Sequence, residues 1–218
     1  MGLADELLLL AYDDQTGKAT VSGIALDLGL AASLLVELAM AGRIDVVDGK
    51  VVLIDPTPTG DELADDVLAR IAGDDRPRPP ESWVQRLRAG LRHRVLDELV
   101  GKGVVRDQED TVLGFIPVHR YPATDPAPEA DSRARLTAAV VGGQEPDRRT
   151  SALCSLVLAL RMEKALFPDR PVKEAQARLS AIAEGDWSGP AARRAIDAVH
   201  AALIAAMTAA VGGAVAAS

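Results

Sequence analysis

Apolar residues recur at helical spacing through the first forty residues of the chain. Leu34 and Leu38 fall on one face of a helix, and Gly42 follows as a C-terminal stop. A second amphipathic stretch begins at Asp61 with acidic residues in its first turn, where they complement the helix dipole. The pattern predicts helices at Leu3–Tyr12, Val21–Leu30 (a short helix or a turn), Ala32–Ala41 and Asp61–Ile71.

Two of the predicted helices end in glycine and are followed by a β-rich segment. After Gly42, the runs 44–47 and 51–54 flank an Asp-Gly pair, which is a strong hairpin signal. A helix predicted over Trp83–Val100 ends near Gly103, and the runs 104–106 and 112–118 then flank a polar segment at 108–110. The unit of helix, glycine and hairpin is therefore expected twice.

No strand signal follows residue 130, and helices are expected at about 131–142, 149–166, 171–184 and 189–211. Hydrophobic residues make up 48% of the chain but aromatics only 3%, which favours helices packed through Leu, Ala and Val. Proline-rich linkers are expected at about 73–80 and 122–129. The sequence predicts a mainly α fold with two small β-hairpins, in a single compact domain over residues 1–218.

The charge of the chain limits its partners. The formal net charge is −8, which argues against broad nucleic-acid binding, because neutralisation of phosphates supplies most of that affinity. No nucleic-acid partner is therefore expected, although a local basic patch remains compatible with this charge.

Three segments bear on the compartment and on membrane spans. The single cysteine, Cys154, lies in an apolar run and is interpreted as a buried, unreactive side chain. The start of the chain carries acids and lacks the basic residues of a secretory signal. The run Ala198–Ala217 is mostly Ala and Gly, which favours a buried core helix over a membrane span. A cytoplasmic location is expected.

Signals of catalysis are scarce. His93, His119 and His200 are scattered along the chain, and none has a second ligand at metal spacing. No glycine-rich phosphate loop follows a predicted strand, and the acidic pairs are typical of solvated helix faces. We therefore predict a protein that is not an enzyme, with no catalytic residue, no metal and no cofactor.

One local feature differs from the acidic background. The segment from Val84 to Arg94 contains four arginines and no acid, and Trp83 precedes it. On one continuous helix Arg88 and Arg92 would share a face, and guanidinium groups bind phosphate bidentately. Trp83, Arg88, Arg92 and Arg94 are the candidate lipid- or anion-binding residues. The alternative is a solvated helix face on which Arg94 pairs with Glu98.

Several short motifs, taken together, resemble those of the Golgi phosphoprotein 3 family. They occur in the family's order over almost the whole chain, and the Ala-rich, acidic composition is similar to that of a bacterial branch. The motifs are Leu7-Leu-Leu-Leu-Ala-Tyr-Asp-Asp14 with Gly17, Gly29-Leu30, Leu34-Leu-Val-Glu-Leu-Ala39 with Gly42-Arg-Ile44, Pro58-Thr-Gly-Asp61, Arg92 with Leu99-Val100 and Lys102-Gly-Val104, and Asp147-Arg-Arg149.

This resemblance implies a central helical bundle wrapped by further helices and small hairpins. It also implies a peripheral membrane protein that reads phosphatidylinositol 4-phosphate and, as an adaptor, grips the cytoplasmic tails of Golgi glycosyltransferases. The family's lipid pocket uses a Trp and an Arg whose matching positions here are Ser22 and Ala31. Two further family arginines fall on Arg92 and on Ala89, with Arg88 beside it. The resemblance therefore implies the fold more firmly than this lipid specificity.

The leading hypothesis is a peripheral membrane or adaptor protein that binds an anionic phospholipid head group or a membrane surface. Its location would be cytoplasmic, at the inner face of the plasma membrane, with cytoplasmic tails of membrane proteins as further partners. A winged-helix-like nucleic-acid-binding regulator is one alternative, suggested by the repeated helix–glycine–hairpin unit. A soluble protein–protein scaffold is another. The sequence does not indicate an oligomeric state.

Overall fold

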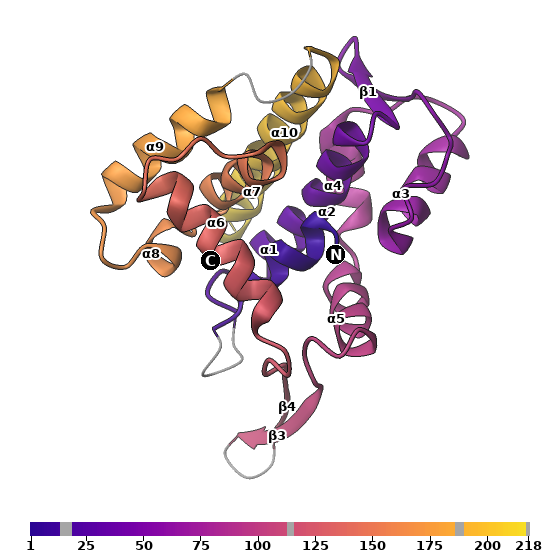
Figure 1. The fold of residues 1–218 in the computed structure, drawn as a ribbon. Coiled ribbons are helices and arrows are strands. Elements are labelled where there is room, and N and C mark those ends of the chain that lie inside the picture. The colour runs from indigo at the N-terminus through magenta and orange to yellow at the C-terminus, as the bar shows by residue number, and fades with distance from the viewer. Residues whose placement is uncertain (14–18, 113–115, 186–189, 217–218) are drawn as a thin grey trace.

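The computed structural model describes residues 1–13, 19–112, 116–185 and 190–216. Within these residues the chain forms ten helices and two antiparallel two-stranded sheets (Figure 1), which confirms the mainly α prediction. The elements are α1 (Leu3–Ala11), α2 (Gly23–Met40), β1 (Ile44–Val47), β2 (Lys50–Leu53), α3 (Glu62–Ala72), α4 (Pro80–Leu87), α5 (Leu91–Gly101), β3 (Gln108–Val112), β4 (Ile116–Arg120), α6 (Ala127–Val140), α7 (Arg148–Ala159), α8 (Glu163–Leu166), α9 (Val172–Glu184) and α10 (Pro190–Ala216).

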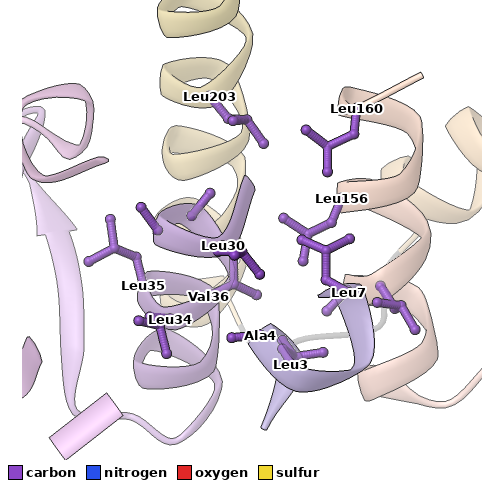
Figure 2. Packing of buried hydrophobic residues seen from close by; sticks show 14 of the residues in the cluster. Leu3, Ala4, Leu7, Leu30, Leu34, Leu35, Val36, Leu156, Leu160 and Leu203 are labelled. Carbon is purple, nitrogen blue, oxygen red and sulfur yellow. The ribbon is translucent and has the colours of Figure 1, made fainter. Parts of the chain in front are cut away.

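The helix α2 is the centre of the fold. It packs against α1, α3, α4, α5, α7 and α10, so apolar side chains cover it on nearly every side. Figure 2 shows Leu30 of α2 between Leu7 of α1 and Leu203 of α10. At Gly29 an added Cβ would lie 2.7 Å from Cδ1 of Leu160, so the missing side chain lets α2 and α7 approach closely.

The same helix is long and apolar enough to cross a membrane by length and composition alone. Its mean hydropathy is 1.8, but 67% of this stretch is buried inside the protein. A core helix that is apolar all round has this character in a water-soluble fold as well. The burial therefore accounts for the apolar character of α2 through packing.

The two short helices expected before Gly42 are wrong as separate elements, because residues 23–40 form one helix. Ser22 caps it, accepting a hydrogen bond on Oγ from the Ala25 backbone N–H at 3.2 Å. Gly29 is the weak point of this helix, because glycine in a helix interior costs about 1 kcal/mol relative to alanine. Close packing against α7 outweighs that weak propensity.

The single helix expected from Trp83 to Val100 is also wrong. It is divided into α4 and α5 at Gly90, whose φ of 71° lies in the left-handed region that glycine adopts without strain. Pro80 lies in the first turn of α4, a position that needs no N–H donor. The break changes how the neighbouring arginines are presented.

The hairpin β1–β2 confirms the prediction made from Asp48-Gly49. Both residues have positive φ, 50° and 70°, and the pairing runs from Ile44 opposite Leu53 to Val47 opposite Lys50.

In the second hairpin, β3 pairs with β4 from Gln108 opposite Arg120 to Val112 opposite Ile116. The first strand expected at 104–106 is wrong, because the polar residues 108–110, expected between the two strands, belong to β3. Gln108 and Glu109 are exposed, and a strand with no buried face at this point accepts polar residues.

From Ala127 onward the described residues form helices and the segments that connect them, with no strand. The helix expected at 149–166 is interrupted at Arg161, whose φ is 58°, and continues as the short α8. The last residues of the expected linker at 122–129 form the first turn of α6, where Pro128 needs no N–H partner. Cys154 is fully buried, and burial raises the pKa of its thiol to about 12, in agreement with an unreactive cysteine.

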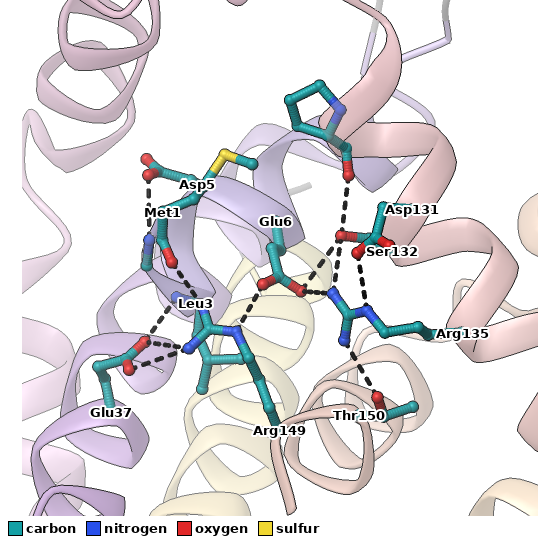
Figure 3. Close-up of polar contacts among 12 residues, drawn as sticks. Met1, Leu3, Asp5, Glu6, Glu37, Asp131, Ser132, Arg135, Arg149 and Thr150 are labelled. Atoms are coloured by element: carbon teal, nitrogen blue, oxygen red, sulfur yellow. Dashed lines mark hydrogen bonds and ion pairs between the residues drawn. The ribbon is translucent and has the colours of Figure 1, made fainter. Parts of the chain in front are cut away.

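Figure 3 shows a buried ion-pair network that joins α1 to α2, α6 and α7. Glu6, 4% exposed, accepts from Arg149 Nε at 2.6 Å and from Arg135 Nη2 at 2.8 Å. Arg149 also donates to the Met1 carbonyl at 2.7 Å and pairs with Glu37 at 3.2 Å. The network neutralises a carboxylate that the core would otherwise exclude.

The neighbouring acid on α1, Asp5, has its own cation. Lys102 Nζ lies 2.7 Å from Asp5 and 2.6 Å from Glu98. The carboxylates of Asp5, Glu98 and Asp61 approach one another closely enough to suggest a metal site. Because the lysine ammonium already supplies their positive charge, this cluster is explained as part of the fold.

Candidate functional site

The four arginines between Val84 and Arg94 do not form one patch. The turn at Gly90 separates Arg86 and Arg88, at the end of α4, from Arg92 and Arg94, in the first turn of α5. Their side chains reach three different places: a cavity beside α3, the N-terminal end of α2, and the outer face of α3. Only Arg88 and Arg92 act on a common neighbour, Asp27.

Arg92 lies against the first turn of α2. Its Nη1 is 3.0 Å from the place where a side chain on Gly23 would begin, so glycine at this position makes room for the guanidinium. The first turn of α2 contains no acidic residue, and its free backbone N–H groups give this end of the helix a positive potential. A guanidinium and a helix N-terminus thus face the same spot, and both favour an anion there.

The carboxylate of Asp27 balances part of this positive charge. Its Oδ1 lies 3.4 Å from Arg92 Nε, and the Asp27 side chain is 26% exposed. Burial raises the pKa of Asp27, against the opposing effects of Arg92, His93 and Arg88 on the same pKa. Although Asp27 and Arg92 form an ion pair, the loss of solvation therefore has a larger effect on the pKa of Asp27 than the neighbouring positive charges have. One partly desolvated acid thus faces two arginines and a histidine, and the site stays net positive.

Both tyrosines of the chain lie beside Arg92. The rings of Tyr12 and Tyr121 meet edge to face with their centroids 6.4 Å apart. Burial raises the pKa of both hydroxyls, and Arg92 opposes the rise in each case. These phenols remain neutral hydrogen-bond donors near the guanidinium. Sequence analysis did not name either tyrosine as a site residue, although Tyr12 lies in the Leu7–Asp14 motif and aromatic residues are rare in this chain.

Trp83 lies away from this site. It is 3% exposed and lines a cavity of about 430 Å³ together with Arg86, Arg78 and Asp74. The Arg86 guanidinium lies 5.6 Å from the centroid of the Trp83 ring, within range of a cation–π contact. The Nε1 donor of Trp83 is buried and has no hydrogen-bond partner among the residues that the structure describes. In this conformation the ring supports α4 and is covered from solvent.

Arg94 points toward α3. Its Nη1 lies 2.9 Å from Asp66, which also pairs with Arg70 at 3.1 Å. The alternative pairing of Arg94 with Glu98 is wrong, because Glu98 binds Lys102 instead. Of the four candidate residues, Arg92 lies at the N-terminal end of α2, Arg88 is within electrostatic range of the same Asp27, and Trp83 and Arg94 lie at other places.

The fold and this site define a class of protein: a helical domain organised around one central apolar helix, with a cationic site at that helix's N-terminal end. The family model described as Golgi phosphoprotein 3 (GPP34) matches residues 3–199 of the chain. The chain therefore belongs to the Golgi phosphoprotein 3 family. The family is described as one of peripheral Golgi proteins that bind phosphatidylinositol 4-phosphate and act as adaptors.

One relative is vacuolar protein sorting-associated protein 74 of Eremothecium gossypii. The two proteins are 26% identical over 164 residues, which cover 64% of this chain. The match covers 49% of the relative, so the chain spans about half the length of the curated relative it matches.

Some of the positions that match the family's lipid contacts lie at the protein surface, and one lies in the core. Ser22 caps α2 next to Gly23 and so borders the place where Arg92 lies. Ala31, in contrast, is fully buried in the core two turns further along α2. Ala89 is exposed in the turn between α4 and α5. Of these positions, Ser22 and Ala89 are therefore at the surface, whereas Ala31 belongs to the core.

Proposed function

We propose that this protein is a peripheral membrane adaptor that binds an anionic head group at the N-terminal end of α2. We call this place the α2–α5 site and define it by Ser22, Gly23, Arg88 and Arg92. The observation that carries the proposal is the Arg92 guanidinium lying against a helix N-terminus that has no acid in its first turn. The fold holds the Arg92 guanidinium and the α2 N-terminus together, and Asp27 balances only part of their positive charge, which favours binding of an anion.

An apolar side chain next to the site supports a membrane as the source of that anion. Ile24, in the first turn of α2, is 51% exposed although its helix is otherwise the core of the fold. An exposed apolar residue beside arginines would enter the acyl boundary while the guanidiniums meet the head groups.

The ligand class we propose is broader than phosphatidylinositol 4-phosphate. Serine and alanine replace an aromatic residue and an arginine of the family's pocket, so Arg92 is left to hold the phosphate with Arg88 and backbone N–H groups. Such a site recognises a phosphate-bearing head group but has few groups to distinguish its sugar. The Ala-rich, acidic composition supports a bacterial origin, where the inner face of the plasma membrane would supply anionic lipids.

The adaptor role follows from membership of the family. We propose that the protein has no catalytic activity and that cytoplasmic tails of membrane proteins are its partners. Binding to a membrane through the α2–α5 site would leave the acidic faces of the domain available to such tails. The net charge of −8 supports basic or amphipathic tail segments as the complementary sequence.

The double variant Arg88→Ala/Arg92→Ala tests the site. Each basic group near an anionic surface contributes on the order of 1 kcal/mol, so the pair should weaken binding to anionic vesicles by about 30-fold. Co-sedimentation with phosphatidylcholine vesicles that contain phosphatidylglycerol, phosphatidylinositol 4-phosphate or no anionic lipid measures this change. Preference for phosphatidylinositol 4-phosphate at equal vesicle charge would show that the family's specificity persists.

The matched control is Arg76→Ala/Lys173→Ala, which removes the same two charges from exposed positions outside the site. It should sediment nearly as wild type does. Equal binding by the two double variants would mean that net charge alone drives association, and the named site would be refuted. Retention of a DNA fragment by the wild-type protein at moderate salt would instead favour the regulator hypothesis.

The substitution Asp27→Asn should strengthen binding to anionic vesicles. It removes the acid that competes with the lipid for Arg92, a gain of about 0.5–1 kcal/mol or a few-fold in affinity. The pKa of Asp27 is raised, so its ionised form costs stability at neutral pH and its loss should not destabilise the fold. Vesicle titration and thermal unfolding measure both effects; weaker binding by a stably folded Asp27→Asn variant would contradict the placement of the anion.

A further inference from the structure

A large cavity lies outside the α2–α5 site and shares no lining residue with it. It has a volume of about 980 Å³ and is formed by α9, α10 and the C-terminal end of α7. Both α9 and α10 pack on α7 but hardly on each other, so a groove stays open between them. Its apolar lining comes mainly from Leu158, Ala177, Ile204 and Met207, and Ile204 is 47% exposed.

The groove is elongated and runs along α10. A smaller cavity of about 140 Å³ continues it and shares Leu158, Ser180 and His200 with it. Along α10 the large cavity runs from His200 to Thr208, about 12 Å at the helical rise, and the small one extends it back to Arg193. The volume lies at the upper end of the range for small-molecule sites, which are mostly apolar with a few polar groups.

One cation marks an end of this groove. Arg161 follows α7, lines the large cavity and is exposed. It forms no ion pair with any acid among the described residues, whereas Arg193 at the opposite end is paired with Asp197 at 3.0 Å. The backbone of Arg161 is in the left-handed region at φ 58°, an uncommon conformation for a residue other than glycine. This backbone conformation ends α7 and leaves the Arg161 side chain at the end of the groove.

The remaining polar groups of the large cavity carry no charge. Gln176, Ser180 and Thr208 are neutral, and burial lowers the pKa of His200, so the imidazole is neutral at physiological pH. The other charged side chains facing this region, Glu184 and Asp197, lie in the small cavity, where Ser180 and Arg193 engage them. A ligand in the large cavity therefore meets an apolar wall and a single positive charge.

We propose that this groove binds a long-chain fatty acid, with its carboxylate at Arg161 and its acyl chain along α10. An extended peptide fits the groove poorly, because the surrounding helices have already paired their backbone groups and leave none for a second chain. An acyl chain has no polar groups to satisfy, and burying it against leucine, isoleucine and methionine is favourable in proportion to the area covered. The single arginine supplies the charge complement to one carboxylate.

The test uses the full chain, freed of lipid, and a dansyl-labelled fatty acid as the fluorescent probe. We expect saturable binding that palmitate displaces and that the uncharged analogue palmityl alcohol displaces about tenfold less well. The variant Arg161→Gln should weaken palmitate binding by about tenfold. The variant Ala177→Trp, at an exposed position of the groove wall, should abolish it by filling the space.

Two controls separate this groove from the α2–α5 site. Lys164→Gln removes an exposed charge close to Arg161 in the chain but outside the groove, and it should bind palmitate as wild type does. Arg88→Ala/Arg92→Ala should also retain palmitate binding. The proposal is overturned if palmitate fails to displace the probe, if Ala177→Trp folds and still binds, or if the Arg88/Arg92 variant loses palmitate binding.

Discussion

Replacement of Arg149 by alanine should lower the free energy of unfolding by about 3 kcal/mol. Removing one partner of a buried ion pair leaves an uncompensated charge, a cost of about 3–5 kcal/mol. Here the acid left behind is Glu6, 4% exposed, which keeps Arg135 at 2.8 Å and Ser132 at 3.2 Å. These remaining contacts place the expected loss at the lower end of that range. Urea denaturation followed by circular dichroism at neutral pH measures it.

The matched control is Arg70→Ala. Arg70 pairs with Asp66 at 3.1 Å within one helix, and its side chain is 51% exposed. An exposed pair of this kind contributes about 0.3–0.5 kcal/mol, so the two variants differ mainly in the burial of the acid. If Arg149→Ala costs no more than Arg70→Ala, the Glu6 network is not what joins α1 to α6 and α7.

The same network explains why several sequence motifs resemble those of the family. Asp147 caps α7, accepting from the Thr150 backbone N–H at 2.7 Å, and Arg149 binds Glu6 two residues later. Asp61 caps α3 in the same way at 2.9 Å, and Lys102 neutralises Asp5. These motifs therefore hold the fold together, which is why they indicate the family and the architecture more clearly than the ligand.

Local signals predicted most of the elements. Asp48-Gly49 was sufficient for the first hairpin, because a two-residue turn with both φ values positive matches the twist of the paired strands and Asp-Gly adopts it readily. The helix breaks were harder. At Gly90 the chain turns, whereas at Gly29 a glycine stays helical because α7 packs against its bare backbone. The difference between these two glycines arises from tertiary contacts, which periodicity along the chain does not contain.

The candidate site could be predicted only in part. A local excess of arginine identified Arg88 and Arg92, since charge is visible in sequence. The direction of each side chain depended on the turn at Gly90, which sends Arg94 to Asp66 and leaves Trp83 in a separate cavity. The partners of Arg92 come from other elements: Gly23 and Asp27 from α2, and the two tyrosines from the end of α1 and the segment after β4. No spacing rule links residues so far apart.

Leu30→Ala should destabilise the protein by roughly 2–5 kcal/mol, because it opens a cavity at the centre of the core. Leu30 is fully buried, and the helices around α2 are held by one another, so they have little freedom to collapse into the space (Figure 2). Ile24→Ala, on the same helix but 51% exposed, should change stability by about 0.5 kcal/mol or less. Chemical denaturation of both variants measures this difference in the free energy of unfolding.

The two variants should have the opposite effects on vesicle binding. Leu30→Ala leaves the α2–α5 site intact below its unfolding transition, so its binding should be unchanged. Ile24→Ala removes the apolar contact we propose with the membrane, so its binding should be weaker. Loss of vesicle binding in a still-folded Leu30→Ala protein, with none in Ile24→Ala, would contradict the assignment of packing to one residue and membrane contact to the other.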